Sequence, residues 1–494
     1  MMKYLMVLDQ GTTSSRAIIY NEMGIEVAKA QEEFRQIYPK AGYVEHDPID
    51  ILSSVRSVIS VVLTKARLKL NDLVGLSIAN QRETVVVWDK LSGEPVYNAI
   101  VWQCRRTADR CLELKNEGYE SMIHEKTGLR LDSYFSASKI EWILKNVDYA
   151  KVLLKENRLL CGTIDTYLMW HLSGGKIYAT DYTNASRTML YNIHELCGDK
   201  ELCKLFNIPI DTLPEVYPSS HIYGTTDKDI VGFEIPICGV AGDQQASLFG
   251  QCCFDEGDLK VTYGTGCFLL MNTASKALDS SNGLITTLSC QTDKNPAYAL
   301  EGSVFVGGAL IQWLRDELKL IEHASDTEDI AKEVPDSNGV YFVPAFVGLG
   351  APYWNFNAEG MITGITRGTT RAHIIRASLE GIAYQVYDVI TAMQNDLKEV
   401  LKMIRVDGGA VANNFLMQFQ SDILSATILK PSNLEITALG AFFLGALALN
   451  LFDSLEDLKK INHIEKTYVS KISLEEKEKL ILGWQKAIRK ACSQ

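Results

Sequence analysis

The stretch that decides the fold runs from residue 5 to residue 20 and reads LMVLDQGTTSSRAIIY. An apolar run leads into a turn rich in Gly, Thr and Ser, and a second apolar run follows, which is the pattern of a β-hairpin. Residues 259–271 repeat the plan as LKVTYGTGCFLLM. One such hairpin near the start of each half predicts a duplicated domain, with the join near residue 250.

The length of the chain agrees with two domains. Its 494 residues exceed what one ordinary core holds, so we expect domains at residues 1–250 and 251–494. Between the strand-like runs, apolar residues recur at helical spacing in residues 140–147, 374–386 and 415–423. Strands and helices that alternate throughout the chain predict an α/β fold.

Composition narrows the class of protein. The chain is 47% hydrophobic and 22% charged, as in a soluble globular protein, and its net charge of -12 disfavours nucleic acid and anionic lipid as partners. The longest apolar run, residues 438–449, is too short to span a membrane and predicts a buried helix. Eleven scattered cysteines, without Cys-x-x-Cys or zinc spacing, favour reduced thiols in a cytoplasmic protein.

The turn inside the first hairpin suits phosphate groups. Residues 11–14 can present backbone N–H groups and hydroxyls together, Arg16 adds a cation, and Asp9 at the strand end can hold Mg²⁺ directly or through water. Alone, this turn is better explained as a plain hairpin. The second turn, residues 264–266, favours a pair of phosphate turns. The chain has neither a P-loop nor a dinucleotide fingerprint.

A third glycine turn follows a strand-like run at residues 403–406 and consists of Asp407, Gly408, Gly409 and Ala410. Its glycines would let a flat ring lie against the backbone, and the following Asn413 can hydrogen-bond a base or a ribose. The alternative is a strand-to-helix turn with an asparagine cap. The nucleotide interpretation therefore depends on the other two turns.

Two polar segments follow apolar strands. Arg82 and Glu83, in the segment NQRET at residues 80–84, offer donors and acceptors for adjacent hydroxyls, or form a surface ion pair. Asp243, in AGDQQ at residues 241–245, can act as a base on a substrate hydroxyl, or cap the next helix. Three aromatic residues, Trp102, Tyr134 and Phe268, could line a ligand site, but such residues more often lie in the hydrophobic core.

Taken together, these segments resemble the FGGY family of carbohydrate kinases, and within it the glycerol kinases. The resemblance runs essentially from end to end. The matching segments are residues 8–16, 81–84, 241–245, 263–266 and 407–414, and two family-wide signatures fit residues 134–142 and 360–380.

The resemblance implies a duplicated actin-like, ribonuclease H-like α/β fold with an interdomain cleft. It implies ATP-dependent phosphorylation of glycerol to sn-glycerol 3-phosphate in glycerol catabolism. Mg²⁺ would be the metal cofactor, and the protein would form a homodimer or a homotetramer. Asp243 would be the general base, and Asp9 would help to place Mg²⁺. Glycerol would bind at Arg82, Glu83, Trp102, Tyr134, Asp243, Gln244 and Phe268. ATP would bind at Thr12, Thr13, Ser14, Arg16, Thr265, Gly308, Gln312, Gly409 and Asn413.

Two alternatives stay open: a kinase for another polyol or ketose of the same family, and an actin-like nucleotide-driven protein that is not an enzyme. Trp102 and residues 81–84 favour glycerol. One loop departs from its relatives. Some bacterial glycerol kinases bind fructose 1,6-bisphosphate with a Gly-Gly-Thr-Arg loop, whereas residues 225–234 here end in Glu234, and no histidine lies between Gly224 and Glu234. Neither control by this sugar phosphate nor histidine phosphorylation in the loop is expected.

Overall fold

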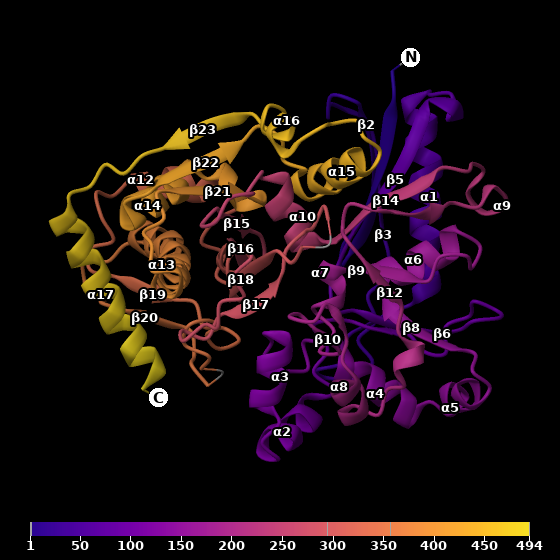
Figure 1. Ribbon diagram of the computed structural model, residues 1–494. Helices are drawn as coiled ribbons and strands as arrows, with labels where there is room; N and C mark the ends of the chain where they lie inside the picture. The colour runs from indigo at the N-terminus through magenta and orange to yellow at the C-terminus, as the bar shows by residue number, and fades with distance from the viewer. Residues whose placement is uncertain (1, 294, 356, 494) are drawn as a thin grey trace.

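The computed structural model describes residues 2–293, 295–355 and 357–493. Two large mixed sheets organise the chain (Figure 1). The first has the strand order β13 (Ile222–Thr225), β14 (Pro236–Gly242), β5 (Leu73–Asn80), β1 (Tyr4–Gln10), β2 (Ser14–Asn21), β3 (Glu26–Glu33). The second has the order β17 (Ile285–Leu288), β18 (Tyr298–Val304), β16 (Cys267–Ala274), β15 (Leu259–Tyr263), β21 (Met403–Asp407), β22 (Thr427–Pro431), β23 (Ile464–Tyr468).

The second sheet repeats the spatial order and strand directions of the first and adds β17 at one edge, although β23 follows β22 in the chain whereas β13 precedes β14. In each sheet the predicted hairpin is antiparallel, β1 with β2 and β15 with β16. The first hairpin strand then pairs in parallel with β5 or β21, which in turn pairs in parallel with β14 or β22. The predicted hairpins and the α/β class are confirmed.

Helices flank the sheets and connect their strands. The predicted helical patterns are confirmed as α4 (Ser136–Asn146), α13 (Arg371–Leu397) and α14 (Asn414–Leu424). The other long or junction helices are α1 (Pro48–Ala66), α6 (Ile164–Leu172), α10 (Asp243–Gly250), α11 (Gly308–Asp316), α15 (Ile436–Ala448) and α17 (Leu474–Cys492). Shorter ones are α7 (Tyr182–Ala185), α9 (Lys228–Val231), α12 (Asp326–Lys332) and α16 (Leu455–Lys459).

An additional layer lies below the first sheet in Figure 1 and carries two of the predicted aromatic residues, Trp102 and Tyr134. It contains a four-stranded sheet in the order β4 (Glu45–His46), β7 (Ala99–Ile100), β6 (Val85–Asp89), β8 (Leu159–Thr163). Helices α2 (Ala108–Asn116), α3 (Glu120–Thr127), α5 (Asp148–Lys155) and α8 (Lys200–Leu205) belong to the same layer. Outside the three larger sheets, the structure has two-stranded sheets formed by β9 (Ala179–Asp181) with β12 (Glu215–Tyr217), by β10 (Tyr191–Asn192) with β11 (Cys197–Gly198), and by β19 (Tyr341–Val343) with β20 (Met361–Thr363).

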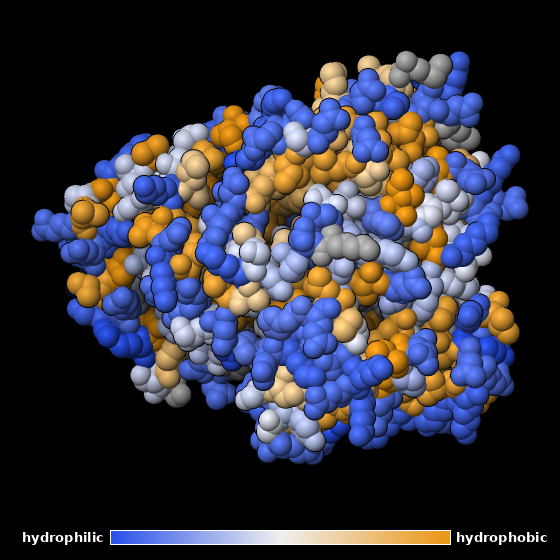
Figure 2. Space-filling view, viewed as in Figure 1, coloured by the Kyte–Doolittle hydropathy of each residue, from blue (hydrophilic) through white to orange (hydrophobic). Residues whose placement is uncertain are grey.

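Helix α15 comes from the second half of the chain but packs on the first sheet. Its apolar side chains share a core with residues of β1, β2 and β14, and Figure 2 shows hydrophobic side chains gathered over this helix. Glycines allow it to approach α10 closely, since a Cβ at Gly440 would lie 1.8 Å from the carbonyl oxygen of Ala246. The buried helix predicted from residues 438–449 is confirmed. No helix in the described part of the chain combines the length and apolar character that crossing a membrane requires.

The C-terminal helix α17 is attached to α13 through a partly buried carboxylate. Asp388 Oδ2 accepts hydrogen bonds from Trp484 Nε1 at 2.6 Å and from the Tyr353 hydroxyl at 2.9 Å. Burial raises the pKa of Asp388 from its ordinary 3.8 to about 7. The folded protein therefore holds this proton more tightly than the unfolded chain, and stability is lost as the pH rises from 3.8 through 7.

We expect Asp388→Asn to stabilise the protein in alkaline solution, because the neutral amide keeps the acceptor oxygen without the cost of a buried charge. The gain in unfolding free energy at pH 8 should exceed the gain at pH 5.5 by about 2 kcal/mol, which is a few degrees in Tm. Thermal melting at the two pH values measures it. Equal gains at both values would contradict the titration of Asp388.

Candidate functional site at the junction of the two halves

The first hairpin turn forms as predicted. Gly11 N–H donates to the Ser14 carbonyl at 3.0 Å, and Thr13 is exposed at the tip. Thr12 Oγ1 accepts a hydrogen bond from Trp102 Nε1 at 3.0 Å. The structure thereby joins a residue predicted to bind phosphate to one predicted to contact the polyol.

The second turn is built on three glycines. Gly264 N–H donates to Gly266 O at 2.9 Å, and Gly308 N–H, at the start of α11, donates to Gly264 O at 2.8 Å. A Cβ at Gly308 would lie only 2.8 Å from that same oxygen, so the approach requires glycine. Thr265 is exposed at the tip of the turn. Gly308 and Thr265, far apart in sequence, are therefore neighbours.

The predicted adenosine residues lie beside this turn or on nearby elements. Gly408 has φ +93°, and a Cβ there would lie 2.5 Å from the Tyr263 carbonyl, whereas Gly409 faces open space. Asn413 Oδ1 caps α14 by accepting from Leu416 N–H at 3.0 Å, so the capping interpretation is confirmed. Gln312 is exposed on α11. Among the described residues, no hydrogen bond joins Gln312, Gly409 and Asn413 to one another.

Arg16 is less free than the sequence suggested. Its guanidinium forms an ion pair with Glu435, just before α15, and lies 3.8 Å from Asp9 Oδ2. Burial raises the pKa of Asp9 to about 6, an effect that nearby Arg16 opposes. Sequence reasoning missed Glu435, because it lies more than four hundred positions from Arg16.

Arg82 and Glu83 are buried, so the surface ion pair considered from the sequence is wrong. Arg82 Nη1 and Nη2 donate to the two oxygens of Glu301 in β18, at 2.6 and 3.1 Å. Arg187 Nε donates to Glu83 Oε1 at 2.6 Å, and Arg187 Nη2 donates to Glu301 Oε1 at 2.9 Å. Glu301 and Arg187 were not predicted. A glutamate as the one charged residue in the strand-like stretch 298–304 was the available signal.

Asp243 is the first residue of α10. The N-cap position belongs to Gly242, so Asp243 is not the cap that the sequence suggested, although its Oδ1 accepts from the Gln244 N–H in the first turn at 2.7 Å. Its carboxylate is 32% exposed, and Oδ1 lies 3.5 Å from Arg82 Nε. Burial raises the pKa of Asp243, and Arg82 and Lys260 oppose that rise.

Gln244 is oriented by a buried lysine that sequence reasoning also missed. Lys260 Nζ donates to Gln244 Oε1 at 2.6 Å and to Thr262 Oγ1 at 2.8 Å. Because the amide oxygen of Gln244 is occupied, its NH₂ group is the end available to a ligand. With Lys260 included, the cluster has three cations and three carboxylates, and this formal neutrality suits an uncharged ligand.

Aromatic rings border the cluster. Trp102 and Tyr134 pack edge to face, with ring centroids 5.6 Å apart. The Arg187 guanidinium carbon lies 5.7 Å from the Tyr134 centroid and 5.1 Å from that of Phe135. Phe268, in β16, is partly exposed, but no described contact joins it to Trp102 or Tyr134.

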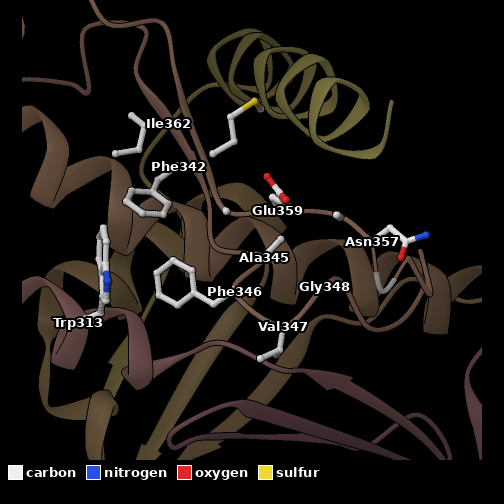
Figure 3. Close-up of a pocket in the computed structure, with 12 residues that line it drawn as sticks. Trp313, Phe342, Ala345, Phe346, Val347, Gly348, Asn357, Glu359 and Ile362 are labelled. Carbon is white, nitrogen blue, oxygen red and sulfur yellow. The ribbon is translucent and has the colours of Figure 1, made fainter. Parts of the chain in front are cut away.

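A cavity of about 1000 Å³ lies elsewhere in the second half (Figure 3). The rings of Trp313, Phe342 and Phe346 lie along one side, and Glu359 and Asn357 lie on another. Its lining includes none of the residues predicted to bind ATP or the polyol. The cavity is therefore separate from the predicted site, although Trp313 directly follows Gln312 on α11.

Comparisons with known proteins agree with this arrangement. Residues 4–250 match the N-terminal domain of the FGGY family of carbohydrate kinases, and residues 259–449 match its C-terminal domain. The chain is 56% identical over 491 residues to a glycerol kinase of Caldanaerobacter subterraneus subsp. tengcongensis, and 57% identical over 491 residues to one of Clostridium botulinum; each match covers 99% of both chains.

Solved structures show the same fold. A Plasmodium falciparum glycerol kinase with ADP superposes with a TM-score of 0.95 at 37% identity, covering 100% of this chain and 99% of the other. A ligand-bound xylulose kinase from Lactobacillus acidophilus has a TM-score of 0.88 at 25% identity, covering 99% and 97%. The expected duplicated actin-like fold is confirmed. A chain whose halves match both domain models belongs to the FGGY family of carbohydrate kinases.

Proposed function

We propose that this protein transfers the γ-phosphoryl group of ATP to glycerol and forms sn-glycerol 3-phosphate. One observation carries the proposal: a buried cluster of balanced charge, containing Arg82, Glu83 and Asp243, lies where the two halves meet. Relatives of equal length and 56–57% identity that are named glycerol kinase support it.

Arg82 and Glu83 are suited to recognise adjacent hydroxyls. Arg187 holds Oε1 of Glu83, and Oε2 has no hydrogen-bond partner among the described residues, so it can accept from a hydroxyl. Arg82 Nε lies 3.5 Å from Asp243 Oδ1 and 3.8 Å from Glu83 Oε1. The Gln244 amide adds a further donor. Trp102, Tyr134 and Phe268 would cover the apolar edge of a three-carbon polyol.

Asp243 would serve as the general base. Arg82 and Lys260 favour its ionised form, which can take the proton of the attacking hydroxyl. The hydroxyl oxygen then bonds to the γ-phosphorus, the bond to the bridging oxygen breaks, and ADP leaves. Phosphoryl transfer depends mainly on such positioning and on charge neutralisation.

The two hairpin turns would hold the phosphates. Thr12, Thr13 and Ser14 contribute from the first turn, and Thr265 and Gly308 from the second. Arg16 can supply positive charge by exchanging its partner Glu435 for a phosphate oxygen. Gly409, Gln312 and Asn413 are the residues we assign to the adenosine.

Asp9 fits the requirement for Mg²⁺. Within residues 2–293, 295–355 and 357–493, no group of three or more His, Cys, Asp or Glu side chains is arranged to hold a metal ion. Mg²⁺ in kinases commonly takes one or two carboxylates and completes its shell with phosphates and water. Burial raises the pKa of Asp9, and a cation bound beside its carboxylate would favour the ionised form, which supports this assignment. When bound, Mg²⁺ neutralises phosphate charge.

Residues 1–250 and 251–494 remain the proposed domains. The eleven cysteines include no disulfide pair in the described structure, and with the use of ATP this supports a reaction in the cytoplasm. A homodimer or homotetramer stays a prediction.

A coupled assay of ADP release tests the function. Xylulose is included because the similar structure from Lactobacillus acidophilus is a xylulose kinase. We expect ADP release to require glycerol and to be weak with xylulose. Release that needs no acceptor would favour the nucleotide-driven alternative, and faster release with xylulose would favour a ketose kinase.

Inhibition by fructose 1,6-bisphosphate should be absent or below about twofold at millimolar concentration, because the loop at 225–234 and its partner Lys176 carry net negative charge. Lys176 Nζ is already paired with Asp227 at 2.9 Å, and α9 brings Asp229 beside them. Initial rates with increasing sugar phosphate measure this. Saturable strong inhibition would show that another surface binds the anion.

A further inference from the structure

A single carboxylate of the second half reaches into the proposed polyol site of the first half. Glu301 is 1% exposed in β18. Its Oε2 accepts from Arg82 Nη1 at 2.6 Å, and its Oε1 accepts from Arg82 Nη2 at 3.1 Å and from Arg187 Nη2 at 2.9 Å. Three charge-assisted hydrogen bonds therefore cross between the two halves at one side chain.

These bonds keep Glu301 ionised. Burial alone would raise its pKa, but Arg187 and Arg82 hold the pKa at about 2. An ionised carboxylate buried this deeply is stable only with such partners. Glu301 therefore carries its full charge at every pH at which the protein would work.

The bonds also determine which donors of Arg82 remain available. Nη1 donates to Glu301 and to Gln245 Oε1 at 3.1 Å, and Nη2 donates one of its two N–H groups to Glu301. The Nε–H and the second Nη2 hydrogen are left. Nε lies on the side of the guanidinium that faces Asp243, the proposed base. The guanidinium plane, and with it the direction of these donors, is fixed by Glu301.

The same carboxylate reaches Glu83 through Arg187. Arg187 bonds Glu301 with Nη2 and Glu83 with Nε, and it lies over the Tyr134 ring. Its Nη1 is buried without a hydrogen-bond partner in the described structure. Glu301 and Glu83 are thus the polar groups that hold this side chain in place.

We propose that Glu301 is a positioning residue, which orients Arg82 directly and Glu83 through Arg187, so that the polyol site is ordered by the second half of the chain. The proposal rests on the proposed function for the identity of the polyol. The arrangement of these four side chains does not depend on it.

The first test is Glu301→Gln, which keeps the side-chain volume and one acceptor oxygen but removes the charge. We expect the KM for glycerol to rise by about 10- to 100-fold, the range for losing hydrogen bonds between charged groups. The Kd of ADP, measured by direct titration, should change by less than about twofold. Glu301→Asp, which keeps the charge on a shorter stem, should recover part of the loss in KM.

A matched control is Glu380→Gln. Glu380, in α13 of the same half, is also buried and also bonds an arginine, Arg376 Nε, at 2.8 Å. The Glu380→Gln substitution should lower the Tm of the protein and leave its KM for glycerol unchanged. A KM for Glu301→Gln within twofold of the unmodified protein, or equal changes in both variants, would overturn the proposal.

A crystal structure of Glu301→Gln tests the arrangement without any assay. Displaced Arg82 and Arg187 side chains would support the proposal, and unmoved ones would overturn it, whatever the acceptor is. The unmodified protein separates the two ideas: no glycerol-dependent ADP release would contradict the proposed function, while the positions of these side chains would still decide the role of Glu301.

Discussion

Asp243→Asn should fold normally and turn over glycerol about 10²- to 10⁴-fold more slowly, the usual contribution of a general base. Asparagine keeps the size of the side chain and one acceptor oxygen but cannot take a proton. The fold should survive because Gly242 occupies the N-cap position of α10, and asparagine keeps the oxygen that accepts from the Gln244 N–H. Steady-state kinetics with thermal melting measure both effects.

Asp388→Asn is the control for this change, since it also replaces an aspartate of raised pKa but lies between α13 and α17. It should keep normal turnover. Near-normal turnover in a folded Asp243→Asn protein would remove Asp243 from the role of base, and Glu83 and Asp9 would be the next carboxylates to examine.

Arg82→Ala should impair glycerol use and stability together. The deletion removes two of the three charge-assisted bonds to Glu301 and leaves its charge to Arg187 alone. Breaking a buried ion pair by removing one partner costs about 3–5 kcal/mol. We expect a lower Tm and a glycerol KM raised by about 100-fold or more, because the site also loses a donor to the substrate.

Nucleotide affinity separates this result from general damage. The phosphate turns lie on other strands, so the Kd of ADP should stay nearly unchanged, and Arg82→Lys supplies a folded alternative if the alanine variant does not fold. A variant that loses nucleotide affinity but keeps its KM for glycerol would show that Arg82 is misplaced.

The hairpins and the helical patterns could be predicted because they are local. The turn at residues 11–14 lies between two apolar runs, and the spacing of apolar residues at 374–386 marks α13 directly. Arg82, Glu83 and Asp243 were also recognisable, since each follows an apolar strand. Their role in substrate binding or catalysis stays a prediction.

Partners far away in the chain could not be predicted. Arg82 and Glu301 are 219 positions apart, and the residues around each one do not indicate that the other is its partner. Lys260 looks like an ordinary strand residue until the fold brings Gln244 within 2.6 Å of its ammonium. Asn413 shows the opposite limit, because a local pattern fits a helix cap and a ligand contact equally well.

The position of α15 has a consequence for how the protein folds while the ribosome synthesises it. The first sheet is complete once residue 242 has been made, but the helix that covers one of its faces ends at residue 448. At a synthesis rate of about 5–20 residues per second, that face of the sheet stays uncovered for roughly 10–40 s before α15 is complete. During this interval the nascent chain exposes Leu5, Val7 and Ile18, which in the finished protein share a core with α15. Chains that terminate before residue 436 never acquire the cover, so they should be substrates for chaperones and proteases.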